Sequence, residues 1–235
     1  KYLMKPFCWL VFGLFVGSNL FLSAQAQVTV DGTTDTTVTP TDNGVRIDNG
    51  DKPNGMTSLR AGNNLFHSFD EFSVPEGSSA SFNNAAEIEN IFSRVTGGNR
   101  SDINGAINAN GGANLLLINP AGIVFGENAS LNIGGSFFAT SADTLLFESG
   151  EFSAVDPQAA PLLTINRPIG LNFGNNPGNI VNRANSGQSR VTSFEQGDRS
   201  EEVTIVNPIG LEVDPGQNLT LLGGNVTLEA GGLTA

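Results

Sequence analysis

Cysteine is almost absent from this chain of 235 residues, and tryptophan and tyrosine are equally rare, with one residue of each. The three lie close together near the N-terminus as Tyr2, Cys8 and Trp9. A chain cut after Ala26 would carry no thiol, which excludes disulfide bonds and cysteine chemistry. We therefore expect its stability to come from packing and backbone hydrogen bonds.

Positive charge is also scarce. Lys and Arg number 11 against 23 Asp and Glu, and no lysine follows Lys52. The net charge of −12 becomes −14 when Lys1 and Lys5 are removed with the N-terminal segment. Nucleic acid and anionic membrane surfaces are poor partners for such a chain, and we expect no nucleic-acid partner.

Long hydrophobic runs are missing except at the N-terminus, where residues 7–22 are almost wholly apolar after the basic Lys1 and Lys5. The segment ends in Ser23-Ala24-Gln25-Ala26, the small-x-small pattern that signal peptidase accepts. The alternative is a transmembrane anchor, but polar and glycine residues interrupt a run that is shorter than the roughly 20 residues of a bilayer span. The sequence predicts a signal peptide over residues 1–26 and an exported chain that begins at Gln27.

The part of the chain after Ala26 is rich in glycine and asparagine, and charged residues make up only 14% of the full chain. This composition disfavours helices. Short runs of Ile, Leu, Val and Phe recur throughout, and disordered chains lack such runs. One helical pattern appears between Ala85 and Val95, where Ile88, Ile91, Phe92 and Val95 recur at helical spacing. We expect one short helix there and strands elsewhere.

Four short apolar runs separated by glycine-containing turns lie between residues 113 and 140. They are Leu115–Ile118, Ile123–Phe125, Leu131–Ile133 and Phe137–Phe138. The same order returns as Val203–Val206, Leu211–Val213, Leu219–Leu222 and Val226–Leu228, and a weaker copy starts at Leu162. These segments predict repeated strands of three to five residues.

One tetrapeptide aligns the copies. Asn119-Pro120-Ala121-Gly122 and Asn207-Pro208-Ile209-Gly210 both place Asn, Pro and Gly at the first, second and fourth positions of a type I turn. Arg167-Pro168-Ile169-Gly170 retains only the Pro and Gly, as a degraded third copy.

Short strands, regular turns and no intervening helices are typical of a solenoid, in which each coil buries its apolar face against the next. Asparagine-rich corners favour a parallel β-helix, because stacked amides can bond between successive coils. The final residues, 229–235, continue a repeat without a polar cap. We expect one domain over residues 27–235 that continues beyond residue 235.

Several motifs, in this order, resemble the N-terminal secretion domain of two-partner secretion exoproteins of the filamentous haemagglutinin type (the haemagglutination activity domain). The resemblance covers the chain from about Val28 onward. The segment Asn119–Ile123 is similar to the family's Asn-Pro-Asn-Gly-Ile motif, with Ala121 in place of the second Asn. Further similar segments are residues 62–74, with Asn, His and aromatic residues, followed by residues 91–99 and 103–105.

The resemblance implies an all-β, right-handed parallel β-helix with extra-helical β elements and an N-terminal cap. It implies secretion through the periplasm and outer membrane of a Gram-negative-type cell to the cell surface or medium. The implied partner is an outer-membrane β-barrel transporter with periplasmic POTRA domains, and the passenger that follows is often an adhesin, with a cell surface or carbohydrate as its target. The candidate residues for partner recognition are Asn64, Leu65, Phe66, His67, Phe69, Phe72, Asn119, Pro120, Gly122 and Ile123.

No residues indicate catalysis, a cofactor or a metal site. His67 is the only histidine, and without cysteines it forms neither a zinc set nor a triad, so we interpret it as structural. The alternative function is a polysaccharide lyase or hydrolase on the same fold, with Arg183, Arg190 and Arg199 as its available basic residues.

Overall fold

The computed structural model describes residues 26–50, 63–148, 150–157, 167–185, 189–196, 199–206, 210–229 and 232–235, and of 189–206 only the backbone strands. The predicted signal peptide, apart from Ala26, lies outside the described residues. So does the start of the weaker repeat copy at Leu162.

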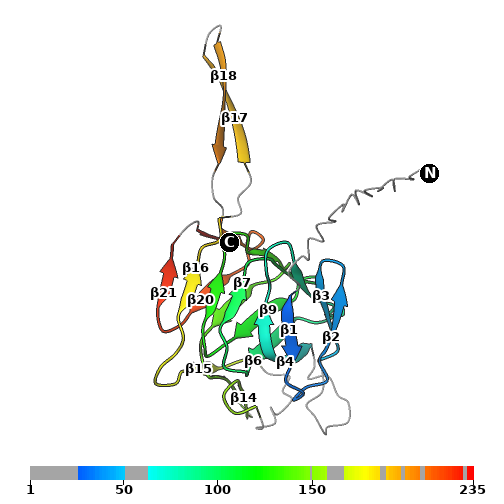
Figure 1. Ribbon diagram of the computed structural model, residues 1–235. Helices are drawn as coiled ribbons and strands as arrows, with labels where there is room; N and C mark the ends of the chain where they lie inside the picture. The colour runs from blue at the N-terminus through cyan, green and yellow to red at the C-terminus, as the bar shows by residue number, and fades with distance from the viewer. Residues whose placement is uncertain are drawn as a thin grey trace, which may run out of the picture.

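The described residues form strands and no helices (Figure 1). The strands are β1 (Gln27–Val30), β2 (Thr37–Thr41), β3 (Gly44–Asp48), β4 (Asn64–Ser73), β5 (Ser79–Phe82), β6 (Asn90–Val95), β7 (Ser101–Ile103), β8 (Ala106–Ala109), β9 (Asn114–Ile118), β10 (Ile123–Phe125), β11 (Ser130–Asn132), β12 (Phe137–Thr140), β13 (Thr144–Phe147), β14 (Gly150–Ser153), β15 (Gly170–Asn172), β16 (Ile180–Asn182), β17 (Ser189–Gln196), β18 (Arg199–Val206), β19 (Leu211–Glu212), β20 (Leu219–Leu222), β21 (Val226–Leu228) and β22 (Leu233–Thr234). The all-β prediction is confirmed. Within the described ranges no helix is available to cross a membrane.

Most strands belong to three sheets. Sheet 1 has the order β1-β4-β6-β9-β12-β20, sheet 2 the order β21-β16-β10-β7, and sheet 3 the order β11-β8-β5-β3-β2. From β6 to β11 the chain visits sheets 1, 2 and 3 and then repeats that order, and each new strand pairs in parallel with the previous one of its sheet. Antiparallel strands occur at the start, where β1 pairs with β4 and β2 with β3.

The main core lies between these sheets. Strands of sheet 1 direct Leu65, Ile91, Leu115 and Phe137 into it, and these residues follow one another in register across the sheet. The opposite face of sheet 1 is covered by the antiparallel sheet β14-β13-β15, which forms a second apolar cluster around Phe66, Phe92, Ile118 and Phe152. Sheet 1 is therefore buried on both faces here, which explains why its strands have nearly continuous apolar sequences.

The helix predicted between Ala85 and Val95 is wrong. This segment contains a turn followed by β6, which extends from Asn90 to Val95. Ile91 and Val95 enter the main core, while Phe92 enters the second cluster on the other face. The helical spacing arose because a strand buried on both faces places apolar residues at adjacent positions.

The predicted correspondence between the two repeat copies is also wrong. β11 and β20 occupy the same place in the two copies, yet β11 lies in sheet 3 and β20 in sheet 1. The first run of the second copy belongs to β18, which pairs with β17 in a separate hairpin that projects from the three sheets (Figure 1). Gly170 of the degraded copy starts β15 and lacks the positive φ of Gly122. Residues 207–209 of the second tetrapeptide lie outside the described residues, but the strands that follow Gly122 and Gly210 lie in different sheets, so the tetrapeptide does not fix which sheet follows it.

Stacked asparagine side chains connect successive strands, as predicted. The amide nitrogen of Asn90 donates to Asn64 Oδ1 over 2.9 Å, and that of Asn114 donates to Asn90 Oδ1 over 3.0 Å. Asn132 donates in the same way to Asn108 over 2.7 Å.

Candidate functional site

The segment Asn119–Gly122 is a turn between β9 and β10. The Gly122 N–H donates to the Asn119 carbonyl over 2.9 Å, and the Ala121 N–H donates to Asn119 Oδ1 over 2.9 Å. Pro120 and Ala121 both have negative φ, which agrees with the predicted type I turn and excludes type II. The Asn119 amide donates to the Asn99 carbonyl and to Ser101 Oγ, each over 2.9 Å. Asn119 therefore joins its own turn to the preceding strand of sheet 2.

Gly122 is required by this turn for two reasons. Its φ is +103°, a conformation that residues with a side chain rarely adopt. A Cβ at this position would also lie 2.6 Å from the carbonyl oxygen of Asn179, which is in the next layer of the structure. The turn thus depends on close backbone packing as well as on glycine's conformational freedom.

From Leu65 to Phe69 the residues of β4 point alternately to the two faces of sheet 1, and a register irregularity opposite Thr29 and Val30 then breaks the alternation before Phe72. Leu65, Phe69 and Phe72 contribute to the main core, and Phe66 contributes to the second cluster. Asn64 is buried at the start of the asparagine stack. The motif therefore forms both apolar clusters at once.

His67 is buried among aromatic rings. Its ring stacks on Phe69 with 6.0 Å between centroids and contacts Phe82 at 5.2 Å. Nδ1 is 3.0 Å from Thr36 Oγ1, whereas buried Nε2 has no hydrogen-bond partner. Burial lowers the pKa of His67 from 6.5 to about 3, against the attraction of Asp48. The imidazole is therefore neutral at physiological pH, which agrees with the interpretation of His67 as a structural residue.

The two motifs form separate parts of the structure. β6 lies between β4 and β9 in sheet 1, so the β4 motif and the Asn119 turn do not combine into one site. Pro120 is half-buried, and the other candidate residues are buried. These are Asn64, Leu65, Phe66, His67, Phe69, Phe72, Asn119, Gly122 and Ile123. In the folded chain a partner protein has access to almost none of their side chains.

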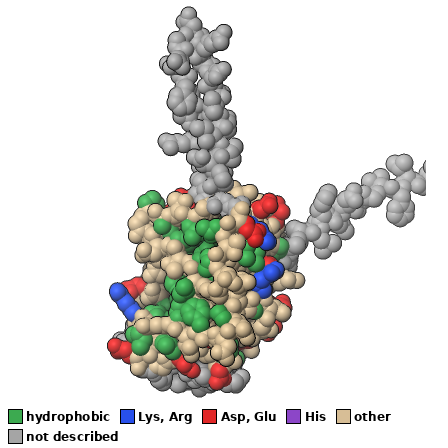
Figure 2. Space-filling model, turned by 90° about the vertical axis from the view of Figure 1, so that its left-hand side faces the viewer, with side chains coloured by type: hydrophobic (Ala, Val, Ile, Leu, Met, Phe, Trp, Pro, Cys, Tyr) green, Lys and Arg blue, Asp and Glu red, His purple; other side chains and the backbone are tan. Residues whose placement is uncertain are grey.

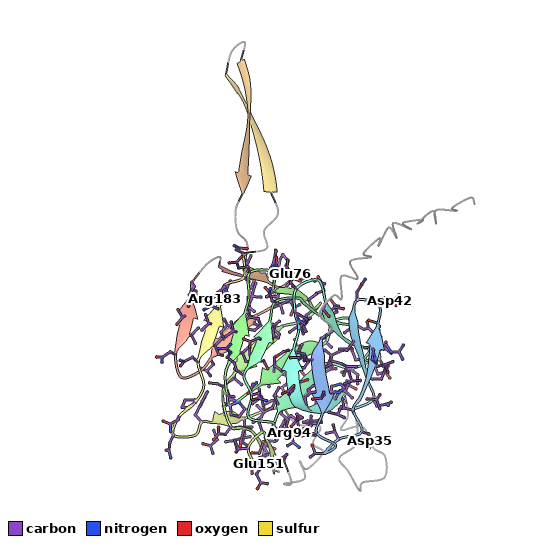
Figure 3. All side chains as sticks on the ribbon, in the orientation of Figure 1. Asp35, Asp42, Glu76, Arg94, Glu151 and Arg183 are labelled. Carbon is purple, nitrogen blue, oxygen red and sulfur yellow. The ribbon has the colours of Figure 1, made fainter. Side chains whose placement is uncertain are left out.

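Sequence reasoning missed a buried polar centre around Arg94, a residue of β6 with no exposed surface. Nε donates to Ser68 Oγ over 2.7 Å, Nη1 to the Ser153 carbonyl over 2.6 Å, and Nη2 to Thr33 Oγ1 over 3.0 Å and the Pro157 carbonyl over 3.2 Å. The guanidinium also lies 4.4 Å from the centre of the Phe152 ring. Figure 3 shows Arg94 at the end of the sheets that also carries Asp35 and Glu151, opposite Arg183.

Asp31 is the counter-charge of this centre. It accepts hydrogen bonds from Ser68 Oγ over 2.6 Å, from Thr96 Oγ1 over 2.9 Å and from the backbone and hydroxyl of Thr33. Burial raises the pKa of Asp31, but these hydrogen bonds outweigh burial and hold it below its usual range. Burial lowers the pKa of Arg94 to about 10, and the negative charges of Asp31 and Asp156 oppose this shift. Arg94 and Asp31 therefore both remain charged at neutral pH.

The centre connects three parts of the chain: the segment after β1, the strands β4 and β6, and the segment from Ser153, the last residue of β14, to Pro157. No sequence motif indicates this centre, because the hydrogen-bond partners of Arg94 are hydroxyl and carbonyl groups from distant positions in the chain. Arg94 itself lies within the segment 91–99 that resembles the family, and an arginine inside an apolar strand is the one signal that could have been noticed.

Of the basic residues named for the alternative enzymatic function, only Arg183 has a described side chain. Arg183 is exposed and pairs with Glu229 over 2.5 Å, which raises the pKa of Arg183 and lowers that of Glu229. The side chains of Arg190 and Arg199 lie outside the described residues. Among the residues that are described, no group of three or more His, Cys, Asp or Glu side chains could hold a metal ion.

Comparison with known proteins identifies relatives. A family model for the TPS secretion domain, in which TPS denotes two-partner secretion, matches residues 26–235. The heme/hemopexin-binding protein of Haemophilus influenzae is 35% identical over 92 residues, which make up 36% of this chain and 9% of that protein. The chain thus matches only a small part of this curated relative.

A solved structure has the same fold. The crystal structure of the HMW1 secretion domain from Haemophilus influenzae matches with a TM-score of 0.50 and 19% identity, and the match covers 89% of this chain and 44% of that one. Together with the family match over residues 26–235, these relationships agree with the resemblance predicted from the sequence motifs. The chain belongs to the TPS secretion domain family of two-partner secretion exoproteins.

Proposed function

We propose that residues 27–235 are the secretion module of a large exported exoprotein, in which a partner transporter of the outer membrane recognises the chain before it folds. Residues 1–26 direct export across the inner membrane, and the transporter's periplasmic POTRA domains then bind the unfolded β4 motif and Asn119 turn. The chain crosses the outer membrane through the transporter's β-barrel and folds at the cell surface.

The observation that carries this proposal is the burial of the candidate recognition residues. Phe66, Phe69 and Ile123 are no more than 1% exposed, and Asn119 has no exposed surface. Side chains inside a core are accessible to a binding partner only while the chain is extended. An extended chain can also add as a strand to a partner's sheet, with main-chain hydrogen bonds for affinity and alternate side chains for specificity.

We further propose that the folded module is a right-handed parallel β-helix with an N-terminal cap. The repeated order of sheets 1, 2 and 3 and the parallel pairing between successive layers support the helix. The antiparallel strands β1 and β2 at the outer edges of sheets 1 and 3 support the cap, and the separate sheet β14-β13-β15 supports an extra-helical element. Such a fold can form layer by layer as the chain leaves a pore.

The last strands support a continuation of the same domain into further layers, and the family resemblance supports a passenger beyond them that acts as an adhesin. Leu222, Val226, Leu228 and Leu233 lie on β20, β21 and β22 with 38% to 52% of their surface exposed. Figure 2 shows hydrophobic side chains gathered on the face of the molecule that carries β21 and β16 in Figure 1. Further layers stacked on these strands would cover this apolar surface.

A secretion assay with the partner transporter tests the proposal. The exoprotein with both Asn119→Ala and Gly122→Ala is expected to accumulate in the periplasm, and its unfolded chain to lose binding to the POTRA domains. The matched control combines Asn176→Ala and Gly77→Ala, at an exposed asparagine and at a glycine with open space around its Cβ position. Normal secretion and normal POTRA binding of the Asn119 and Gly122 variant would refute the role of this motif.

A further inference from the structure

A groove lies on the outer face of sheet 1, beside the antiparallel sheet that covers the rest of this face. Its volume is about 540 Å³. Asn90 and Asn114 and the apolar residues Leu116 and Phe138 come from sheet 1, and Leu171 comes from β15 on the other side. None of the candidate secretion residues lines this groove, so its function can differ from secretion.

The asparagines of the groove retain hydrogen-bonding capacity. Each amide nitrogen has two N–H groups, and the stacking bonds from Asn90 to Asn64 and from Asn114 to Asn90 use one of them. These bonds also hold both amides in fixed orientations next to each other along the sheet. The groove therefore presents two oriented donors at half-buried positions.

Two charged residues complete the polar part of the groove. The carboxylate of Glu89 accepts a hydrogen bond from the Asn63 amide over 2.8 Å through one oxygen, and its second oxygen is a further acceptor. Arg167 contributes a guanidinium on the side of β15. Their charges cancel, so the groove is close to neutral within a chain of net charge −12.

The apolar part consists of the half-buried Phe138 and the leucines beside it. A ring face next to oriented amides and a carboxylate matches a sugar ring, which carries hydroxyl groups around its edge and C–H groups on its face. An apolar peptide fits this groove less well, because it would cover the amides and the carboxylate without satisfying them. An acidic glycan also fits less well, because the net negative charge of the protein repels it.

We propose that this groove binds a neutral oligosaccharide on the folded module, with Asn90, Asn114 and Glu89 bonding to sugar hydroxyls and Phe138 lying against a sugar ring. The site binds without cleaving. Glycosidic hydrolysis requires two carboxylates across the bond, and among the described residues Glu89 is the only carboxylate that lines the groove. The folded module then holds glycan independently of its passenger.

Titration of the folded chain with hexamers of β-1,4-glucan, α-mannan and β-galactan, followed by NMR of the asparagine side-chain amides, tests this site. We expect at least one hexamer to bind with a dissociation constant below about 1 mM and to shift the Asn90 and Asn114 amides. Glu89→Gln and Phe138→Ala should each weaken that binding by about tenfold or more. Glu151→Gln, at an exposed residue of β14 outside the groove, should leave it unchanged.

The proposal is overturned if no hexamer binds, if binding persists in both groove variants, or if only acidic glycans or apolar peptides shift these amides. Circular dichroism of each variant establishes that it is folded. Arg167→Ala, at an exposed position, provides a second variant should Phe138→Ala fail to fold, with the same loss of binding expected. The Glu89→Gln variant should be secreted normally. Loss of glycan binding therefore tests the groove alone, and loss of secretion in the Asn119 and Gly122 variant tests the secretion proposal alone.

Discussion

Arg94 and Leu222 belong to the same row of sheet 1, since Arg94 pairs with Ile118, Ile118 with Thr140 and Thr140 with Leu222. The charged residue has no exposed surface, whereas the apolar residue is 41% exposed. β13, β14 and the segment after β1 cover the first strands of sheet 1, and none of these described elements covers the last strand, β20. Position relative to these covering elements, more than residue type, therefore decides what is buried in this sheet.

The comparison also separates two kinds of surface. The N-terminal and central strands bury the side chains of the motifs that resemble the family, and under our proposal a partner binds these side chains before the chain folds. The C-terminal strands keep apolar side chains accessible after folding. We therefore expect substitutions to affect stability strongly in the first region and weakly in the second.

The largest difference should come from truncating apolar side chains in the two regions. Phe69→Ala removes a fully buried ring that packs against Phe72 and Phe82, and should cost about 3 to 5 kcal/mol of unfolding free energy. Leu228→Ala, at a residue 52% exposed, should cost less than about 1 kcal/mol. Urea unfolding measures both. Equal losses would show that the last strands are as well packed as the first.

Arg94→Ala should cost about 3 kcal/mol, because it removes a buried charge and leaves the Ser153 and Pro157 carbonyls without their donor. The control is Arg100→Ala, which removes an arginine from an exposed pair with Asp102 and should change stability by about 0.5 kcal/mol or less. The same unfolding assay applies. A loss for Arg94→Ala as small as that of the control would mean that the buried centre does not hold the covering segments in place.

Gly122→Ala should cost about 2 to 3 kcal/mol, because it combines positive φ with a Cβ only 2.6 Å from the Asn179 oxygen. Gly77 also has positive φ, but nothing lies within 4 Å of its Cβ position. Gly77→Ala should therefore cost about 1 kcal/mol. The difference between the urea unfolding midpoints of the two variants measures the destabilisation caused by the close contact between Gly122 and Asn179. Equal midpoints would show that this contact does not destabilise the Gly122 variant.

His67 should make stability depend on pH. The unfolded chain takes up a proton near pH 6.5, but in the folded chain burial lowers the pKa of His67 to about 3. Stability should therefore fall as the pH decreases below 6.5, by about 2 kcal/mol between pH 7 and pH 5. His67→Gln should reduce this slope. An unchanged slope in the variant would mean that His67 is protonated equally in both states.

Local features of this fold could be predicted from the sequence. Short apolar runs and abundant glycine and asparagine indicate strands, and Asn119-Pro120-Ala121-Gly122 forms the expected turn because its bonds lie within four residues. The motif residues could be named in advance, but their burial in two different clusters depends on the sheet that covers them.

Features that depend on distant segments could not be predicted. The apolar spacing in residues 85–95 suggested a helix, since the second covering layer that buries Phe92 comes from residues beyond 144. The partners of Arg94 come from positions as far apart as Thr33 and Pro157. The tetrapeptide that aligned the repeats does not specify the sheet that follows it, since the strands after Gly122 and Gly210, β10 and β19, lie in different sheets.

The most direct test of the account compares the affinity of the transporter's POTRA domains for the folded chain and for unfolded peptides that span residues 63–74 and 113–125. Because the motif side chains are buried after folding, the peptides should bind at least about tenfold more tightly than the folded chain. A folded chain that binds as tightly as the peptides would show that recognition uses the folded surface, and would contradict the central claim.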